Sequence, residues 1–365
     1  MASGNGGQIA FAKLNSLYSD VNTVNLWFPF VSESLEHTLQ ELEEGTITSR
    51  RDAPDSFKGL DGGGGDINFE PNPNALGHIF KAWFGTHAAS AVTAAGSLGA
   101  NSGNFSAYPQ QWHKFTPRQS SYSDRTFLEP YNVMVYRDVG SAWLHKGVIA
   151  PNFKLQVQAN QLVKASVSVM ARQVDRIERT AAIESLVSSG GRPWVWDMAS
   201  IEVSTIGVAT AGLIADTGFE AINLSFDFPH EGVPLLDGTK YNGEFTPSDF
   251  RRVTIDGTVS FRDQDEYDAF TTYEARRMRI TLLNVNSNFY LGNPASADTT
   301  KFLGYPGLRV HLPQLKFTSW SAPIGGPNRL TASFNAKAEY SDADGFSVCA
   351  ELLNIVASVD YTQGY

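Results

Sequence analysis

Cysteine is almost absent from this chain of 365 residues, in which Cys349 is the single one. One cysteine excludes an intrachain disulfide and favours synthesis in a reducing compartment. Its neighbours Phe346 and Val348 predict a small buried side chain rather than a reactive thiol.

Charge is scarce as well, since Asp, Glu, Lys and Arg make up only 18% of the chain. Lys and Arg (28) are outnumbered by Asp and Glu (38), which gives a formal net charge of -10. Affinity for phosphate depends on Lys and Arg, so this balance argues against a primary role in binding nucleic acid. It remains compatible with a surface past which nucleic acid slides without sticking.

Long hydrophobic runs are missing. No apolar stretch approaches the roughly 20 residues that a membrane-spanning helix needs. The first residues lack the basic and apolar regions of a secretory signal, so we expect a product that is soluble and cytoplasmic when made. With 42% apolar residues, the chain can still build one large or two to three ordinary domains. The low charge fits equally a surface buried against copies of the same chain or a large β domain covered by uncharged polar residues.

Strand signals dominate what is present. Apolar and polar residues alternate with a period of two at 163–169, 224–228, 253–261 and 330–340. This period predicts mostly antiparallel sheets with one packed and one polar face. Turns are expected at residues 159–161 and 324–328.

Two helices are predicted, at residues 75–84 and 266–273. The first has apolar residues at helical spacing, with Asn74 placed to cap its start and Gly85 just beyond its end. Asp263 and Glu266 have the spacing of a capping box before the second. Each helix is expected to lie against a sheet.

The same order of elements occurs in both halves of the chain: a long polar segment, a strand, a helix and three further strands. We therefore infer a structural duplication, with a connector in which residues 176–187 are a candidate helix. The expected units are an N-terminal arm (1–30), a first half (31–174) with an exposed insertion (88–124), the connector (175–217) and a second half (218–365).

Motifs for catalysis, cofactors or metals are weak. The glycines at 62–65 open a strand rather than a helix, which predicts a hinge at the base of a loop instead of a phosphate cradle. The acidic run at 263–268 lacks the glycine and final glutamate of a calcium loop. The seven histidines are scattered without zinc-site spacing. We therefore expect no catalytic residues, no cofactor and no metal.

Four segments resemble the major tail tube proteins of long-tailed (siphovirus-type) bacteriophages. They are an acidic extended segment running into a basic loop (36–51), a strand–helix unit (65–82) and paired strands at 250–261 and 312–317. The resemblance implies a mainly β, β-sandwich fold with flanking helices, in subunits that close into stacked rings and form a hollow tube for DNA ejection. It implies a virion protein made in the bacterial cytoplasm, with one sheet of each half lining the channel.

The resemblance also implies partners. Relatives with one such domain form hexameric rings, so a duplicated chain implies a trimeric, pseudo-hexameric ring, with a hexamer as the alternative. Tape measure, tail-tip and tail-terminator proteins are the other expected partners. Genomic DNA would pass through the lumen without specific binding, and no membrane is involved.

The resemblance implies that the long loop between the first strands reaches the adjacent ring. The loops 45–65 and 232–250 mix apolar anchors with charges, which suits a surface buried on assembly. Two solvated hairpin loops are the alternative for these segments. The candidate contact residues are Arg50, Arg51, Asp55, Phe57, Lys58, Leu60, Leu235, Leu236, Tyr241 and Phe245.

The sequence leaves two other functions open. A β-sandwich module that binds carbohydrate or a receptor would use exposed aromatic residues, for which Tyr108, Trp112 and Tyr131 are candidates. A hydrolase with a dispersed carboxylate site has no motif in its favour. The sequence therefore predicts a structural protein and not an enzyme.

Overall fold

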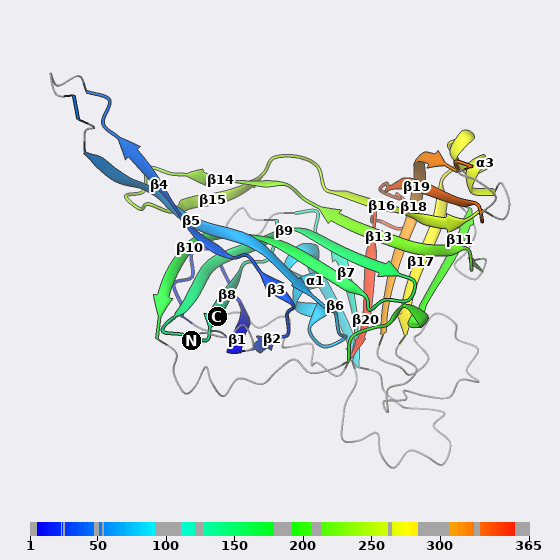
Figure 1. Ribbon diagram of the computed structural model, residues 1–365, viewed down its shortest axis with the longest axis horizontal. Coiled ribbons are helices and arrows are strands. Elements are labelled where there is room, and N and C mark those ends of the chain that lie inside the picture. The colour runs from blue at the N-terminus through cyan, green and yellow to red at the C-terminus, as the bar shows by residue number, and fades with distance from the viewer. Residues whose placement is uncertain are drawn as a thin grey trace, which may run out of the picture.

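The computed structural model describes residues 6–22, 24, 26–46, 51–52, 55–91, 111–120, 127–178, 192–205, 213–261, 265–283, 307–324 and 329–354. Strands dominate, as the alternation predicted, and those that pair do so in antiparallel ladders. Figure 1 shows an elongated molecule from which one long hairpin projects. Within the described part of the chain, no helix is long and apolar enough to cross a membrane.

The described residues of the first half form ten strands and one helix. In chain order they are β1 (Gly7–Lys13), β2 (Leu26–Phe28), β3 (Ser32–Glu33), β4 (Glu36–Glu43), β5 (Ser56–Phe69), α1 (Leu76–Phe84), β6 (Gly85–Ala91), β7 (Gln111–Pro117), β8 (Tyr131–Arg137), β9 (Ala142–Gln158) and β10 (Lys164–Ile177). Neighbouring strands pair in the order β5, β10, β9, β8, β1, β2.

The second half follows the same plan. Its elements are the 3-10 helix η3 (Trp196–Met198), β11 (Ala199–Thr205), β12 (Ile214–Ala215), β13 (Phe219–Asp227), β14 (His230–Pro234), β15 (Asn242–Pro247), β16 (Arg252–Ser260), α3 (Asp265–Thr271), β17 (Arg276–Leu283), β18 (Gly307–Ser321), β19 (Thr331–Ala338) and β20 (Cys349–Asn354). Here the pairing order is β16, β19, β18, β17, β11, β12. Each strand of this ladder has a counterpart at the same place in the first ladder, and a helix follows both β5 and β16.

The two ladders meet where β9 pairs with β13. This joint produces one long sheet in the order β4, β5, β10, β9, β13, β16, β19, β18, which we call the long sheet. β9 pairs with β10 along most of its length, and its other edge pairs with β13 through residues 152–158 and with β8 through residues 143–148. β18 pairs with β19 through residues 315–321 and with β17 through residues 307–315.

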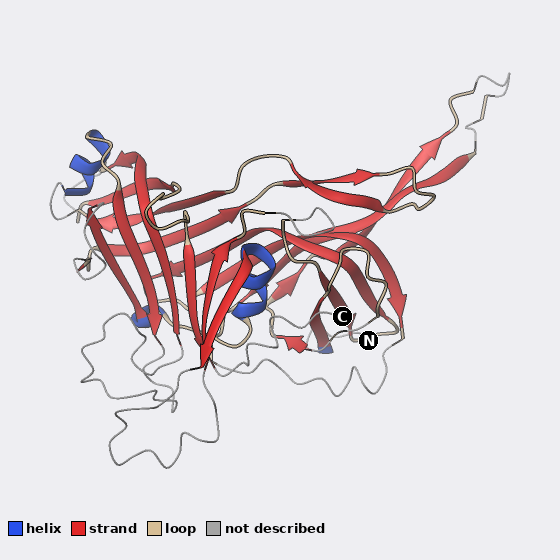
Figure 2. Cartoon of the chain, turned by 180° about the vertical axis from the view of Figure 1, so that it is seen from behind, coloured by secondary structure: helices blue, strands red, loops and turns tan. Residues whose placement is uncertain are grey.

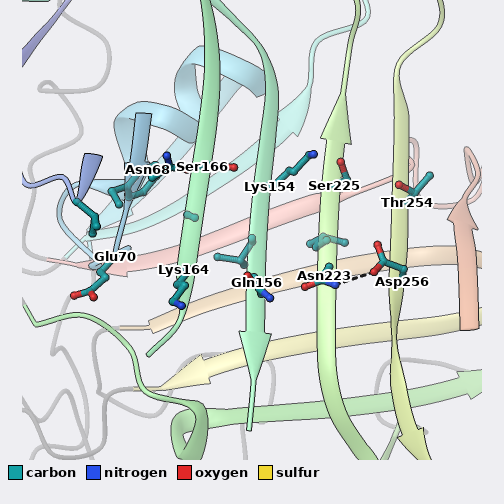
Figure 3. A pocket seen from close by; sticks show the side chains of 15 residues that line it. Asn68, Glu70, Lys154, Gln156, Lys164, Ser166, Asn223, Ser225, Thr254 and Asp256 are labelled. Carbon is teal, nitrogen blue, oxygen red and sulfur yellow. Dashed lines mark hydrogen bonds between the residues drawn. The ribbon is translucent and has the colours of Figure 1, made fainter. Parts of the chain in front are cut away.

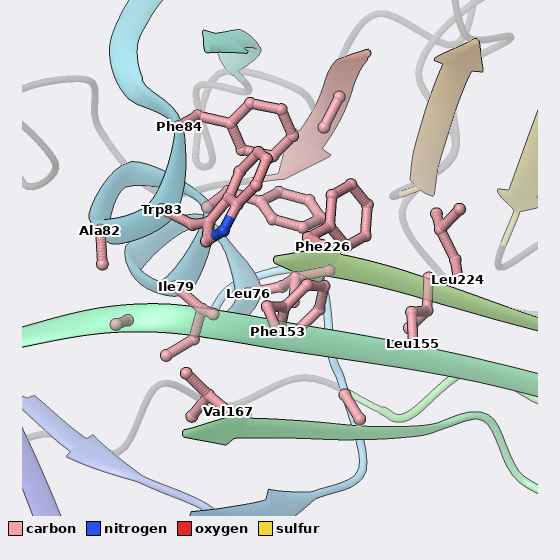
Figure 4. Packing of buried hydrophobic residues seen from close by; sticks show 14 of the residues in the cluster. Leu76, Ile79, Ala82, Trp83, Phe84, Phe153, Leu155, Val167, Leu224 and Phe226 are labelled. Carbon is pink, nitrogen blue, oxygen red and sulfur yellow. The ribbon is translucent and has the colours of Figure 1, made fainter. Parts of the chain in front are cut away.

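One face of the long sheet forms the core. Helix α1 lies against it, and Trp83 packs edge-on against Phe226 of β13, with ring centroids 5.2 Å apart (Figure 4). Phe80 packs in the same way against Phe153 of β9, with ring centroids 5.6 Å apart. The indole of Trp83 also donates a hydrogen bond to the carbonyl of Pro151. Aromatic side chains bury large apolar areas, so this cluster fixes the helix on the sheet and ties both halves into one core.

The loop predicted around residues 45–65 is largely a strand. β4 and β5 form a hairpin that extends beyond the body of the molecule (Figures 1 and 2). The glycines at 62–65 lie inside β5 rather than at a hinge, between β4 on one side and β10 on the other. A Cβ on Gly64 would lie 2.6 Å from the carbonyl oxygen of Val169, so the close approach of the neighbouring backbone requires glycine.

The structure places secondary structure in several segments that the sequence left without assigned strands. The expected N-terminal arm contains β1 and β2, and the expected connector contains η3, β11 and β12. Arg176 lies in β10, whereas most of the candidate helix at 176–187 is outside the described residues. The ends of the expected exposed insertion are β6 and β7, which pair with each other, and β7 continues the ladder to β20.

The structure confirms the predicted end of the first helix and corrects the residue that caps its start. Gly85 ends α1 with φ of 77°, as predicted. At its start, Asn72 accepts hydrogen bonds from the backbone N–H groups of Asn74 and Ala75, at 3.1 and 2.9 Å, in the role that Asn74 was expected to have. The capping-box residue Asp263 lies outside the described residues.

Candidate assembly surfaces

The long sheet ends in two edges that are unpaired among the described residues. At one end, β3 and β4 pair only with β5. At the other end, residues 316–321 of β18 pair with β19 on one side, and their opposite side faces no described strand. Unpaired edges of this length offer free backbone N–H and C=O groups to another strand.

The second surface is the polar face of the long sheet, opposite the core. Side chains alternate in and out along each strand, so Lys154 and Gln156 of β9 point away from the buried Phe153 and Leu155. On the same face, Asn223 of β13 donates a hydrogen bond of 2.7 Å to Asp256 of β16 (Figure 3). Uncharged hydroxyl and amide groups occupy most of this face.

The third surface is the arm, which we define as β4 together with residues 56–61 of β5. All of β4 is exposed, and Leu39, Leu42 and Phe57 are 56%, 48% and 62% exposed. Near the base of the arm, His37 and Lys58 both contact the carboxylate of Asp61, which is itself buried. Three exposed apolar side chains on one projecting hairpin are typical of a contact that is completed by another molecule.

The second hairpin, β14–β15, folds back on the chain. The backbone N–H of Asp61 donates to the carbonyl of Lys240 at 2.6 Å, and the guanidinium of Arg172 donates to the carbonyl of Asn242 at 3.0 Å. Arg172 also lies over the ring of Tyr241. This hairpin of the second half is therefore docked against β5 and β10 of the first half.

The predicted contact residues differ in how exposed they are. Arg51, Asp55, Phe57 and Lys58 are exposed on or next to the arm, and Leu60 is half-buried in β5. Leu235 and Leu236 are exposed at the end of β14, and Tyr241 is half-buried. Phe245 is only 1% exposed, so it packs in the chain's own core instead of facing a neighbour. Arg50 lies outside the described residues.

Leu39 and Leu42 were missed from the sequence. Both lie in β4, whose side chains are all exposed and mostly charged or polar. A leucine in such a segment has no distinguishing sequence pattern, and only the projection of the hairpin shows that it is exposed among the described residues.

The features expected of other functions are weak. Tyr131 is 3% exposed and Trp112 is half-buried, whereas Tyr108 lies outside the described residues. Cys349 is buried as predicted, and burial raises the pKa of its thiol to about 12. Nε2 of His87 and Nδ1 of His113 are 3.0 Å apart, but no cluster of three or more metal-ligating side chains occurs in the described residues.

Comparison with known proteins identifies a family. The family model described as "Phage tail tube protein" matches residues 4–338. No curated protein matches the sequence. Among solved structures, the chain is similar to one from the "Virion of native gene transfer agent (GTA) particle", with 13% identity over 40% of this chain and 93% of that one and a TM-score of 0.26.

The family model covers nearly the whole chain, and the open sheet edges and the exposed arm offer surfaces for association with further copies. The chain belongs to the phage tail tube protein family, and it is a structural virion protein that self-assembles into stacked rings, which form the hollow tail tube through which genomic DNA is delivered.

Proposed function

We propose that the chain is an internal duplication of the tube-building unit and that three copies close a pseudo-sixfold ring. The observation that carries this proposal is the shared pairing order of the two ladders, joined edge to edge at β9 and β13. The β9–β13 joint within one chain would thus correspond to the contact between two neighbouring positions of the ring. Three chains supply the six positions that single-unit relatives of the resembled family fill with six subunits.

The internal joint suggests how neighbouring chains meet. β18 stands where β9 stands in the first ladder, and β3 and β4 precede β5 as β13 precedes β16. By this equivalence, residues 316–321 of β18 pair with the β3–β4 edge of the next copy. Ring closure would then pair both free edges and leave none exposed to aggregation.

The dimensions suit the role. Three copies of the long sheet give a barrel of roughly 24 strands, spaced about 4.8 Å apart and tilted about 40°, which is about 45–50 Å across at the backbone. Such a channel admits duplex DNA with room for side chains.

The arm is proposed to join successive rings. β5 runs from the long sheet into the arm without interruption, and the hairpin leaves the body along the strand direction (Figure 1). Strands in a closed barrel lie within about 35–45° of its axis, so the arm would leave through the end of the ring. Leu39, Leu42 and Phe57 would become buried against the adjacent ring.

Other partners belong to the same proposal. A stacked tube needs end-binding proteins, for which tail-tip and tail-terminator proteins are proposed, and a tape measure protein in its lumen. The subunit would be made in the bacterial cytoplasm and would act without catalysis, and DNA would pass without sequence-specific binding.

Cryo-electron microscopy of tubes assembled from the full chain tests this proposal. We expect rings of three subunits with sixfold-like end views and continuous density from β18 to β3–β4 of the next copy. Hydrogen exchange should show new backbone protection in these segments on assembly. Six copies per ring would reject the trimer while leaving the tube function intact.

A further inference from the structure

The polar face of the long sheet is concave. A depression of about 690 Å³ extends across β5, β10, β9, β13 and β16 and is lined by residues such as Asn68, Gln156 and Thr254 (Figure 3). The opposite face is covered by α1 and the core. If the proposed ring closes, this concave polar face must line the channel, because three such cores cannot fit inside the barrel.

The residues of the polar face fall into rows that cross the strands at right angles. One row has the continuous register Asn68, Ser166, Lys154, Ser225, Thr254, Lys337, Lys316. We call this the lysine row, and it contains no carboxylate. Acidic residues occupy the flanking rows, where Asp227 pairs in register with Arg252 and Asp256 with Asn223.

The polar face does not share the acidity of the whole chain, which carries a net charge of -10. In the lysine row and its two flanking rows, the cations balance the carboxylates among the described residues. The cations are Lys154, Lys164, Arg252, Lys316 and Lys337, and the carboxylates are Asp66, Glu70, Asp227, Asp256 and Glu339. The excess acid therefore lies elsewhere on the subunit.

We propose that the lysine row is the track on which the phosphates of passing duplex DNA touch the channel wall. This inference rests on the ring arrangement proposed above. Ammonium groups attract phosphate without reading sequence, while hydroxyl and amide groups between them exchange hydrogen bonds with water and phosphate. Because strands tilt in a closed barrel, the row forms an inclined stripe rather than a flat belt.

The lysines of the row are not equivalent. Lys316 is 3.0 Å from Glu339 and lies over the ring of Tyr273, so its charge is already partnered. Lys154 and Lys337 are exposed, and neither has a carboxylate at ion-pair distance in the described residues. Lys154 and Lys337 should therefore make the phosphate contacts, and Lys316 provides a matched control on the same row.

The first experiment locates the face. A maleimide gold cluster is attached to Ser225→Cys in the row or to Thr86→Cys, an exposed β6 residue off the polar face, and the assembled tubes are imaged by cryo-electron microscopy. Cys349 should stay unlabelled because it is buried. We expect gold from Ser225→Cys inside the channel. Gold on the outer surface of intact tubes would reject the lysine row as a DNA contact and leave the tube function intact. Failure to form tubes would instead count against the proposed function.

The second experiment measures DNA retention. Tubes are sedimented with short duplex DNA over a range of NaCl concentrations. For Lys154→Gln/Lys337→Gln, the slope of log retention against log salt should become shallower by about 1 for each lysine that contacts a phosphate. Lys316→Gln should change the slope less. An unchanged slope in the double variant, with the gold inside the channel, would reject the lysine row as a contact surface.

Discussion

At Gly65, β5 passes its neighbours with no room for a side chain. Its φ of 144° is unfavourable for other residues, and an added Cβ would overlap the carbonyl oxygen of Ser34. Gly65→Ala should therefore lower the free energy of unfolding of the unassembled subunit by about 3 kcal/mol or more, measured by urea denaturation.

Gly140 provides the control for backbone strain alone. It also has positive φ, at 71°, but a Cβ there would meet nothing within 4 Å. Gly140→Ala should cost about 1–2 kcal/mol. Equal losses for the two variants would show that the crowding at Gly65 is unimportant.

Buried histidines should make the subunit sensitive to acid. Burial lowers the pKa of His78, His87 and His145 to about 4 each. The unfolded chain, with histidine pKa values near 6.5, binds more protons between these values. The free energy of unfolding should thus be highest above about pH 6.5 and fall as the pH drops towards 4, by up to about 1.4 kcal/mol per pH unit for each histidine.

Urea denaturation of unassembled subunits between about pH 7 and 4.5 measures this dependence. Replacing one of the three histidines, in His145→Gln, should reduce the loss of unfolding free energy at low pH by the contribution of one histidine. A variant that loses stability with acid as steeply as the parent would exclude His145 as a contributor.

At the scale of elements, the arm is the feature with a separable task. Leu39→Ser/Leu42→Ser/Phe57→Ser removes its exposed apolar groups and should change subunit stability by no more than about 0.5 kcal/mol for each site. Electron microscopy should then show single rings in place of tubes. Deleting residues 45–65 is a less clean test, because it removes much of β5, whose glycines pair with β10.

Val139→Ser is a suitable comparison for the arm variant. Val139 is 61% exposed and lies off the arm, in the turn between β8 and β9. This variant should still form tubes. Tubes of normal length from the arm variant would mean that rings stack through other surfaces.

The elements also show what the sequence could and could not predict. β10, β13, β16 and β19 were predictable because each has one buried and one polar face, which produces alternation. β4 has no such alternation, since all its side chains are exposed and only pairing with β5 keeps it extended. The resemblance to tail tube proteins, and not a local pattern, predicted an extended segment there. β1 was missed for the opposite reason, because residues 9–13 are buried on both faces and do not alternate.

The assembly surfaces were predictable only in part. Phe57 was identified because it is an apolar residue in a polar segment, and it is exposed. Phe245 was chosen on the same ground, yet it is buried because β14–β15 folds back onto the first half. Such docking depends on contacts between segments far apart in sequence, which a local pattern does not contain.

At the scale of the whole molecule, the joint between β9 and β13 has a consequence for the kinetics of tube growth. Since both strands belong to one chain, this joint forms at a high effective concentration that dilution does not change. In a ring of three, only alternate joints would then depend on collisions between subunits. A ring needs fewer independent bodies to meet, so its concentration threshold falls, and the two halves are free to diverge. The β6–β7 ladder, which has no counterpart among the described residues of the second half, would then mark every second position around the tube.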